Sequence, residues 1–188
     1  MQRSPVFVVL LRAIGPWTHK IMSMSQWRDA VGARGFDAPE TLLATGNMIV
    51  GGNGTTRDMA AAMDAVVTAC GLTDANRAIV RTPQSLRTLC DADPFTEASR
   101  ERPSQMGVYF FAESEPDLGW VADYQGPERL AVVEGHLIID YGGPISKSTL
   151  TGKSIEKLSG PATARNWNTL RLLAERASGR EQGSDRSS

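Results

Sequence analysis

The first half of the chain switches between strand-like and helix-like hydrophobic patterns. Residues 4–13, SPVFVVLLRA, form a nearly continuous apolar run, which is typical of a strand buried on both faces. Ser23 and Gln26 then form a capping-box pattern at the start of a stretch with helical spacing of apolar residues, and Gly35 ends that stretch. The pattern therefore predicts a strand followed by a helix.

A hairpin and a second helix follow. Thr45-Gly46-Asn47 separates two short apolar runs and predicts a turn, because Gly and Asn tolerate positive φ. Thr55 or Thr56 begins a second helix, which ends at Gly71, and residues 77–82, RAIVRT, form a fourth strand. The resulting order, β-α-β-β-α-β, is that of a ferredoxin-like antiparallel sheet with both helices on one face.

The second half partly repeats this pattern. Pro83 begins a helix that ends at Asp93-Pro94, and Glu134-Gly135 is a two-residue hairpin turn between two apolar runs. A loop runs from Gly142 to Ser154, and a final helix begins at Thr163. The predicted strands are residues 105–112, 128–133 and 136–141, with a short helix or turn at 117–124. The order α-β-α-β-β-α suggests a rearranged copy of the first plan.

These patterns predict an α+β chain with two ferredoxin-like α/β subdomains, whose antiparallel sheets carry their helices on one face. The first subdomain spans residues 1–82 and the second spans residues 83–178. Residues 179–188 are too polar to fold and are expected to form a disordered tail.

Composition narrows the functional classes. The chain has 188 residues and a formal net charge of −1, which argues against a broad electrostatic nucleic-acid surface. No apolar run approaches the length of a membrane span, and the N-terminus lacks the pattern of a secretion signal. We therefore expect a soluble, cytoplasmic protein that does not contact a membrane, and its richness in Arg, Ala and Gly suggests a bacterial source.

Two cysteines, Cys70 and Cys90, are too few for a disulfide framework, and we expect both to be buried free thiols. No His, Cys, Asp or Glu spacing matches a metal site, so we expect no metal and no cofactor. No Ser/His/Asp or Cys/His pattern indicates nucleophilic catalysis.

Thr151-Gly-Lys-Ser154 resembles the end of a phosphate-binding P-loop. The first glycine of that motif is missing, because Lys147 stands in its place, and a hairpin strand leads into the loop instead of a parallel one. We therefore reject a nucleotide triphosphatase. Lys147, Lys153 and Lys157 could still attract an anion, although a solvated surface loop explains them more simply.

The loop after the first strand carries Arg12, His19 and Lys20. An arginine directly after a buried strand needs a partner, because burying an unpaired guanidinium is costly. A structural ion pair and a ligand contact explain Arg12 equally well. His19 is more simply a residue that fixes the loop than a catalytic acid or base.

Residues 163–177, TARNWNTLRLLAERA, begin with an unusually polar cluster. We expect Thr163 to cap the helix, Trp167 to anchor it in the core and Asn166 to bind the backbone of another segment. Arg165 and Asn168 share the polar face beside the positive helix N-terminus, which is a possible anion site.

Three segments together are similar to a known family. LLRAIG (10–15), ATGNMIV (44–50) and TARNWNTL (163–170) resemble the bacterial family known as domain of unknown function 1697. That resemblance implies two ferredoxin-like α+β subdomains and no established activity. Ala13 and Gly15 depart from the usual Leu-Leu-Arg-Gly-Ile-Asn motif, and Pro16-Trp17 stands where Gly is usual, as in a divergent member. The matched signature positions are Arg12, Gly46, Asn47, Arg165 and Asn166.

We therefore expect a binding protein for a small anionic ligand or a nucleic-acid phosphate in a cleft between the subdomains. The predicted ligand contacts are Arg12, Lys20, Asn47, Arg165 and Asn168, with Gly46, Thr163, Asn166 and Trp167 as structural positions. An enzyme that uses His19 and Arg12 in the cleft is one alternative. A structural or partner-binding module is the other.

Overall fold

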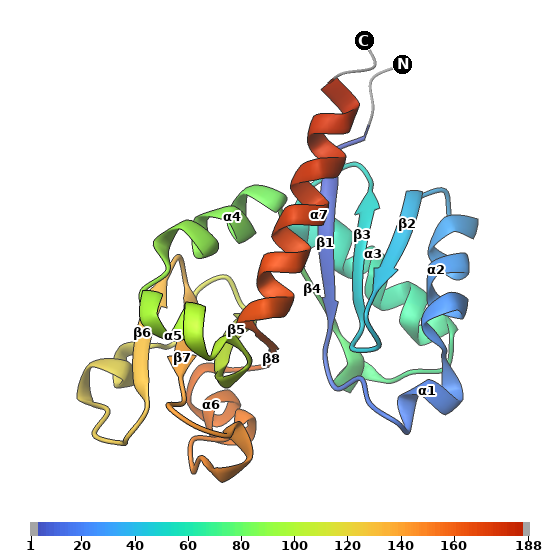
Figure 1. Ribbon diagram of the computed structural model, residues 1–188. Coiled ribbons are helices and arrows are strands. Elements are labelled where there is room, and N and C mark those ends of the chain that lie inside the picture. The colour runs from blue at the N-terminus through green and yellow to red at the C-terminus, as the bar shows by residue number, and fades with distance from the viewer. Residues whose placement is uncertain (1–3, 186–188) are drawn as a thin grey trace. The chain divides into compact units, whose positions relative to one another are not determined.

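The computed structural model describes residues 4–185. The chain divides into two compact units, Met1–Leu86 with Leu173–Ser188, and Arg87–Leu172. Each unit contains one four-stranded antiparallel sheet (Figure 1). The predicted α+β class with two antiparallel sheets is confirmed.

The first sheet has the strand order β2-β3-β1-β4. Its strands are β1 (Val6–Leu11), β2 (Asp37–Leu42), β3 (Asn47–Gly51) and β4 (Ala78–Arg81). Phe7 to Leu11 of β1 are all buried, as expected for a central strand covered on both faces. The β2–β3 hairpin turns at the predicted place, with Gly46 at φ +74°.

Two helices cover one face of this sheet, α2 (Met24–Ala33) and α3 (Thr56–Ala69), and a short helix α1 (Thr18–Ile21) precedes them. Both long helices begin with a complete capping box, Ser23 with Gln26 and Thr55 with Asp58. Their apolar residues pack on one side of the strands. Trp27, Val31, Met59, Met63 and Val66 of the helices share one core with Phe7, Leu11 and Met48 of the strands.

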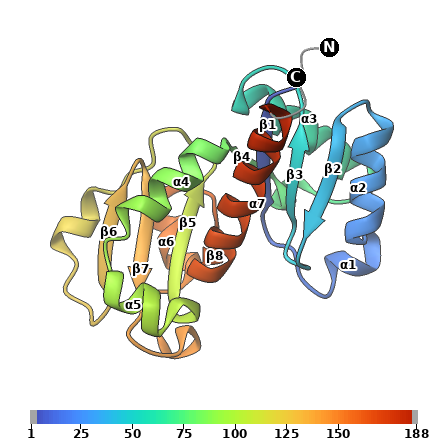
Figure 2. The same ribbon diagram turned by 45° about the horizontal axis from the view of Figure 1, so that its top comes forward.

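The second sheet has the strand order β6-β7-β5-β8. Its strands are β5 (Met106–Phe111), β6 (Arg129–Val133), β7 (His136–Asp140) and β8 (Ala162–Asn166). The helix α6 (Gly152–Ser159) and the 3₁₀ helix η3 (Gly119–Asp123) pack on one face through Ile155, Trp120 and Val121. Helices α4 (Pro83–Ala92) and α5 (Thr96–Glu101) lie on the other side of the sheet (Figure 2). Three further 3₁₀ turns are η1 (Asp74–Asn76), η2 (Pro103–Gln105) and η4 (Ile145–Lys147).

Strand β8 and helix α6 were not predicted, because residues 142–154 were interpreted as loop and residue 163 as a helix start. With both elements present, the second sheet has the element order β-α-β-β-α-β, with η3 in the place of the first helix. The strand order is the same as in the first sheet once β5–β8 are matched to β1–β4. The second unit is therefore a direct repeat of the plan of the first.

The strand registers match position by position. Val8 pairs with Ile49 and Arg81, and Val108 pairs with Ile138 and Arg165. Leu11 pairs with Ala78 just as Phe111 pairs with Ala162. The two sheets therefore give an internal comparison: a side chain that the plan itself requires should recur at the matched position.

The last helix, α7 (Trp167–Asp185), belongs to both units, and its residues from Leu173 onward belong to the first. This part runs along the face of the first sheet opposite α2 and α3 (Figure 1, Figure 2). Arg180 donates to the backbone carbonyl oxygens of Ala38 (2.7 Å), Asp37 (2.6 Å) and Ile49 (3.2 Å). The β2–β3 register shifts between Asp37 and Glu40, where these contacts lie.

The predicted disordered tail is therefore wrong for residues 179–185, which are helical; residues 186–188 lie outside the described residues. Composition alone misled the prediction, because it does not reveal the hydrogen bonds by which Arg180 attaches this end of the helix to the first sheet. Between residues 4 and 185, no helix is both long and apolar enough to cross a membrane.

Candidate functional site

The most distinctive polar feature of the first unit is the turn that joins α3 to β4. Thr73 caps η1 and Asn76 completes a capping box, with the Thr73 N–H donating to Asn76 Oδ1 at 3.3 Å. Gly71, at φ +93°, ends α3 before the turn. The sequence Thr-Asp-Ala-Asn-Arg therefore forms a compact, self-capped turn and leaves the side chains of Asp74 and Arg77 exposed.

The loop after β1 is attached to this turn. Asn76 is 5% exposed, and its Nδ2 donates to the carbonyl oxygens of Arg12 (3.3 Å) and Ala13 (3.2 Å). The backbone N–H of Arg12 donates to the Arg77 carbonyl oxygen at 3.0 Å. The first signature segment, LLRAIG, thus fixes the position of the turn, and the turn fixes Arg77.

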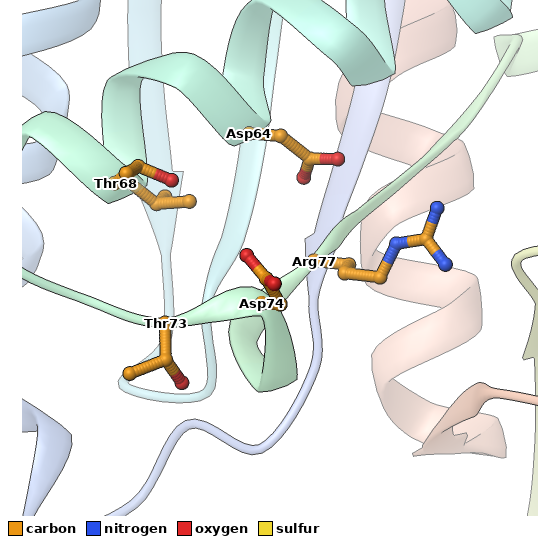
Figure 3. A pocket seen from close by; sticks show the side chains of 6 residues that line it. Asp64, Thr68, Thr73, Asp74 and Arg77 are labelled. Atoms are coloured by element: carbon orange, nitrogen blue, oxygen red, sulfur yellow. The ribbon is translucent and has the colours of Figure 1, made fainter.

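A pocket of about 340 Å³ lies between α3 and the turn (Figure 3). It is lined by Asp64, Val67, Thr68, Thr73, Asp74 and Arg77. Asp64 extends from α3 toward the turn, Asp74 extends from the turn toward α3, and Arg77 extends from the start of β4 (Figure 3). The volume lies at the lower end of the range for small-molecule sites, roughly 300–1,000 Å³.

The charges in this pocket do not neutralise one another. Oδ1 of Asp64 accepts the Ala78 N–H at 2.7 Å, which fixes that carboxylate and leaves its second oxygen toward the pocket. Within residues 4–185, no hydrogen bond or ion pair joins the side chain of Asp74 or Arg77 to another residue. Two carboxylates and a guanidinium therefore line one small space as separate charges.

The internal repeat shows which of these groups the fold itself uses. In the second sheet the N–H of Ala112 donates to the Pro161 carbonyl at 2.8 Å, which is the bond that Arg12 makes with Arg77. Glu156 Oε1 accepts the Ala162 N–H at 2.9 Å, which matches Asp64 with Ala78. The helix acid is thus structural in both copies, whereas the cationic side chains of Arg12 and Arg77 have no counterpart at Ala112 and Pro161.

Sequence reasoning singled out Arg12 but missed Asp64, Asp74 and Arg77. Arg12 is half-buried, and its Nη1 donates to the Ala75 carbonyl at 3.2 Å, so it lies beside the pocket-bearing turn. A usable signal was present, because Arg77 stands immediately before an apolar strand, just as Arg12 follows one. The acidic residues gave no such signal, since Asp64 and Asp74 converge only when α3 and the turn fold together.

Two other residues of the first loop do not line the pocket. His19 Nε2 lies 2.8 Å from the Ala44 carbonyl oxygen, so the ring attaches α1 to the β2–β3 turn. Lys20 is exposed, with Nζ 5.4 Å from the centre of the Trp17 ring. Trp17 is itself 72% exposed. The interpretation of His19 as a residue that fixes the loop therefore agrees with its geometry.

The second signature segment is held by the first. A Cβ at Gly46 would lie 2.8 Å from the Cβ of Leu11 and 2.8 Å from Cγ1 of Ile14. Asn47 is fully buried, and its Nδ2 donates to the Leu42 carbonyl (3.0 Å) and to Thr45 Oγ1 (2.9 Å). Gly46 has the expected structural role, and Asn47 uses its amide to close the turn rather than to face a pocket.

The third segment folds differently from its prediction. Thr163 and Arg165 lie in strand β8, and Asn166 caps α7, with its Oδ1 accepting the Thr169 N–H at 2.9 Å. The assignments of Thr163 as the cap, of Asn166 to the backbone of another segment and of Arg165 to a helix face are therefore wrong. A five-residue edge strand of Ala, Thr, Arg and Asn has little apolar signal of its own, and its pairing with β5 decides its conformation.

Arg165 is 7% exposed, and its Nη1 donates to Thr163 Oγ1 (2.7 Å) and the Ala164 carbonyl (2.8 Å). Burial lowers the pKa of its guanidinium to about 10, which leaves it charged at neutral pH. Arg81, its match in the first sheet, makes the same bond to the preceding carbonyl and has its pKa lowered to about 10 by burial. Trp167 is fully buried, as expected of a core anchor, and Asn168 is exposed.

Polar clusters in the second unit satisfy one another. Asp140 accepts hydrogen bonds from Arg102 and Arg129, and Glu128 accepts hydrogen bonds from Tyr124 and Ser148. Thr151 caps α6, so the Thr-Gly-Lys-Ser stretch is a helix start. These groups bind one another and so have a structural role in the second unit. The pocket of the first unit is therefore the stronger candidate for a ligand-binding site.

Cys70 and Cys90 are free and half-buried. Burial raises the pKa of the Cys90 thiol to about 11, so it is protonated at neutral pH. In the described part of the chain, no three His, Cys, Asp or Glu side chains come together as a metal site would require.

Comparison with known proteins agrees with this architecture. Residues 5–137 match the sequence pattern of the family described as protein of unknown function DUF1697. The chain belongs to this family. This DUF1697 protein shares its fold with the conserved bacterial protein SP0830 from Streptococcus pneumoniae, at a TM-score of 0.68 and 12% identity. The similarity covers 94% of this chain and 99% of that one. No curated protein matches the sequence.

Proposed function

We propose that this protein binds a small molecule with a protonated amino group in the pocket between α3 and the η1 turn. The observation that carries the proposal is the pair of carboxylates, Asp64 on α3 and Asp74 on the turn, that line one space of about 340 Å³ (Figure 3). Separate negative charges in a partly enclosed space favour a cation, because both carboxylates can accept its hydrogen bonds.

An ammonium group fits this lining better than a metal ion. It donates three hydrogen bonds, and the pocket offers a free Asp64 oxygen, the Asp74 carboxylate and the Thr68 hydroxyl. Hard divalent cations take six or more oxygen ligands, and two carboxylates supply too few of them.

The site differs from the one expected from sequence. An anionic ligand between the two subdomains, contacted by Arg165 and Asn168, stays a prediction. Arg165 gives it less support than expected, because its guanidinium is buried and bonds within its own strand. An enzyme that uses His19 also has less support, because the ring nitrogen Nε2 is engaged with the Ala44 carbonyl.

The proposal is tested by NMR titration of the ¹⁵N-labelled protein with ethylammonium chloride, with tetramethylammonium chloride as a cation that cannot donate hydrogen bonds. We expect ethylammonium to shift the amide signals of Thr68, Thr73 and Asp74, with much weaker shifts from tetramethylammonium. Asp74→Asn should weaken binding about 10-fold, which corresponds to the loss of one charge-assisted hydrogen bond.

The matched control is Asp123→Asn, which removes an exposed carboxylate of the second unit. It should leave the dissociation constant unchanged. Equal effects of the two substitutions, or shifts spread evenly over the surface, would mean that ethylammonium binds only as a general counter-ion, and the proposal would be wrong.

A further inference from the structure

We infer that the ligand of this pocket is a zwitterion, whose carboxylate is held by Arg77 while its ammonium is held by Asp64 and Asp74. This inference rests on the proposed function and adds the second charged group of the ligand. Arg77 lines the same pocket as the two acids, and none of the three forms an ion pair with another (Figure 3).

The internal repeat carries the argument. The position of Arg77 requires only a backbone carbonyl, which accepts the N–H of residue 12 at 3.0 Å. In the second sheet the matched carbonyl belongs to Pro161, which accepts the N–H of Ala112 at 2.8 Å with no charged side chain at either place. The fold therefore does not require a guanidinium at this position. We assign the charge of Arg77 to ligand binding instead.

The position of Arg77 suits a ligand contact. Its backbone is fixed by the bond to Arg12 and by β4, which begins at the next residue, while its side chain is exposed. A guanidinium presents paired N–H groups that match the two oxygens of a carboxylate. Because the backbone is already fixed and the guanidinium is exposed, a carboxylate can bind to it at a small cost in conformational entropy of the protein.

A separation of opposite charges within one pocket selects for ligands that carry both. A simple amine leaves Arg77 unpaired, and a simple carboxylate faces Asp64 and Asp74 as well as Arg77. An amino acid neutralises all three groups together. The small volume, about 340 Å³, favours short, unbranched amino acids over bulky ones.

The test measures dissociation constants by isothermal titration calorimetry for glycine, β-alanine, γ-aminobutyrate and 5-aminovalerate. Each is compared with its amide, which lacks the negative charge, and with its N-acetyl form, which lacks the positive one. We expect at least one of the four free amino acids to bind about 10-fold more tightly than its amide, and the N-acetyl forms to bind most weakly. Arg77→Gln should remove the preference over the amide, and it should not weaken binding of the cationic amide, because it takes a positive charge away from the pocket.

The outcomes separate this inference from the proposed function. If every amide binds as tightly as its free amino acid and Arg77→Gln changes neither, the zwitterion inference is wrong and the amine site stands. If neither the free amino acids nor the amides bind, or if the N-acetyl forms bind best, the proposed function is wrong as well. Arg87→Gln, on helix α4 of the second unit, is the control for loss of one positive charge and should leave all the affinities unchanged.

Discussion

The backbone N–H of Arg12 donates to the carbonyl oxygen of Arg77 at 3.0 Å, and this bond joins the loop after β1 to the turn before β4. Ala112 and Pro161 make the same bond in the second sheet. The connection therefore belongs to the repeated plan, and the two arginine side chains are additions to it. The contributions of the backbone bond and of the side chains can be separated by experiment, because truncating a side chain leaves the backbone hydrogen bond in place.

Arg12→Ala should lower the free energy of unfolding by less than about 1 kcal/mol, because the backbone bond remains and the bond from Nη1 to the Ala75 carbonyl, at 3.2 Å, is exposed to solvent. Asn76→Ala should cost more, about 1–3 kcal/mol, because the part-buried carbonyls of Arg12 and Ala13 both lose the donor that joins them to the turn. Urea denaturation measures both. A larger loss for Arg12→Ala than for Asn76→Ala would show that the Arg12 side chain is itself structural.

Gly46→Ala should destabilise the protein by about 2 kcal/mol or more, because alanine is strained at φ +74° and its Cβ would lie 2.8 Å from Leu11 and Ile14. Gly15→Ala is the matched control, since a Cβ there meets no atom within 4 Å. Thermal unfolding of the two variants checks this expectation. Similar melting temperatures for both would mean that the hairpin can move away from the loop after β1.

Arg180→Ala should lower the free energy of unfolding by about 2 kcal/mol, because three backbone carbonyls of the first sheet lose a charged donor. Arg176→Ala removes an arginine one helical turn earlier, whose exposed ion pair with Glu40 contributes at most about 1 kcal/mol. The comparison tests whether the end of α7 is an integral part of the first unit. Equal, small effects would instead support the polar tail that composition suggested.

Asp140→Asn should destabilise the second unit by about 2–4 kcal/mol, because Arg102 and Arg129 lose their shared carboxylate. Burial alone raises the pKa of Asp140, but the hydrogen bonds from the two arginines outweigh it and lower the pKa to about 2. The folded pKa is thus below the unfolded value of 3.8, so the contribution of this carboxylate is present above pH 4 and is lost as the pH falls toward 2.

Unfolding measured between pH 6 and pH 2 checks the sign of this dependence. The wild type should lose stability over the acid range, whereas Asp140→Asn should lose less, since it has no carboxylate to protonate at that position. Asp29→Asn is the control, because its ion pair with Arg28 is exposed. Parallel acid profiles for the wild type and Asp140→Asn would contradict the assignment.

The sequence predicted the fold best where local signals and packing agree. The apolar run of β1, the capping boxes at Ser23 and Thr55 and the Gly46 turn all appear where they were expected. Strand β8 was missed because its residues have weak strand propensity, and its conformation depends on pairing with β5, which lies more than fifty residues earlier in the chain. Helix α6 did carry a signal, since Thr151 and Ser154 form its N-terminal cap.

The candidate site was less accessible to sequence reasoning. Arg12 could be selected because a charge directly after a buried strand is unusual. Asp64 and Asp74 have an ordinary context in the sequence, and their importance comes from convergence with Arg77 on one pocket. The decisive contrast, Arg77 against Pro161, depends on strand registers that only the three-dimensional pairing supplies.

The most direct measurement is a crystal structure of the protein soaked with 5-aminovalerate or whichever of the four amino acids binds most tightly. We predict density between α3 and the η1 turn, with the ligand nitrogen within hydrogen-bond distance of Asp74 and the ligand carboxylate on the guanidinium of Arg77. An empty pocket at a saturating ligand concentration, or a ligand bound with its carboxylate turned away from Arg77, would contradict the central claim.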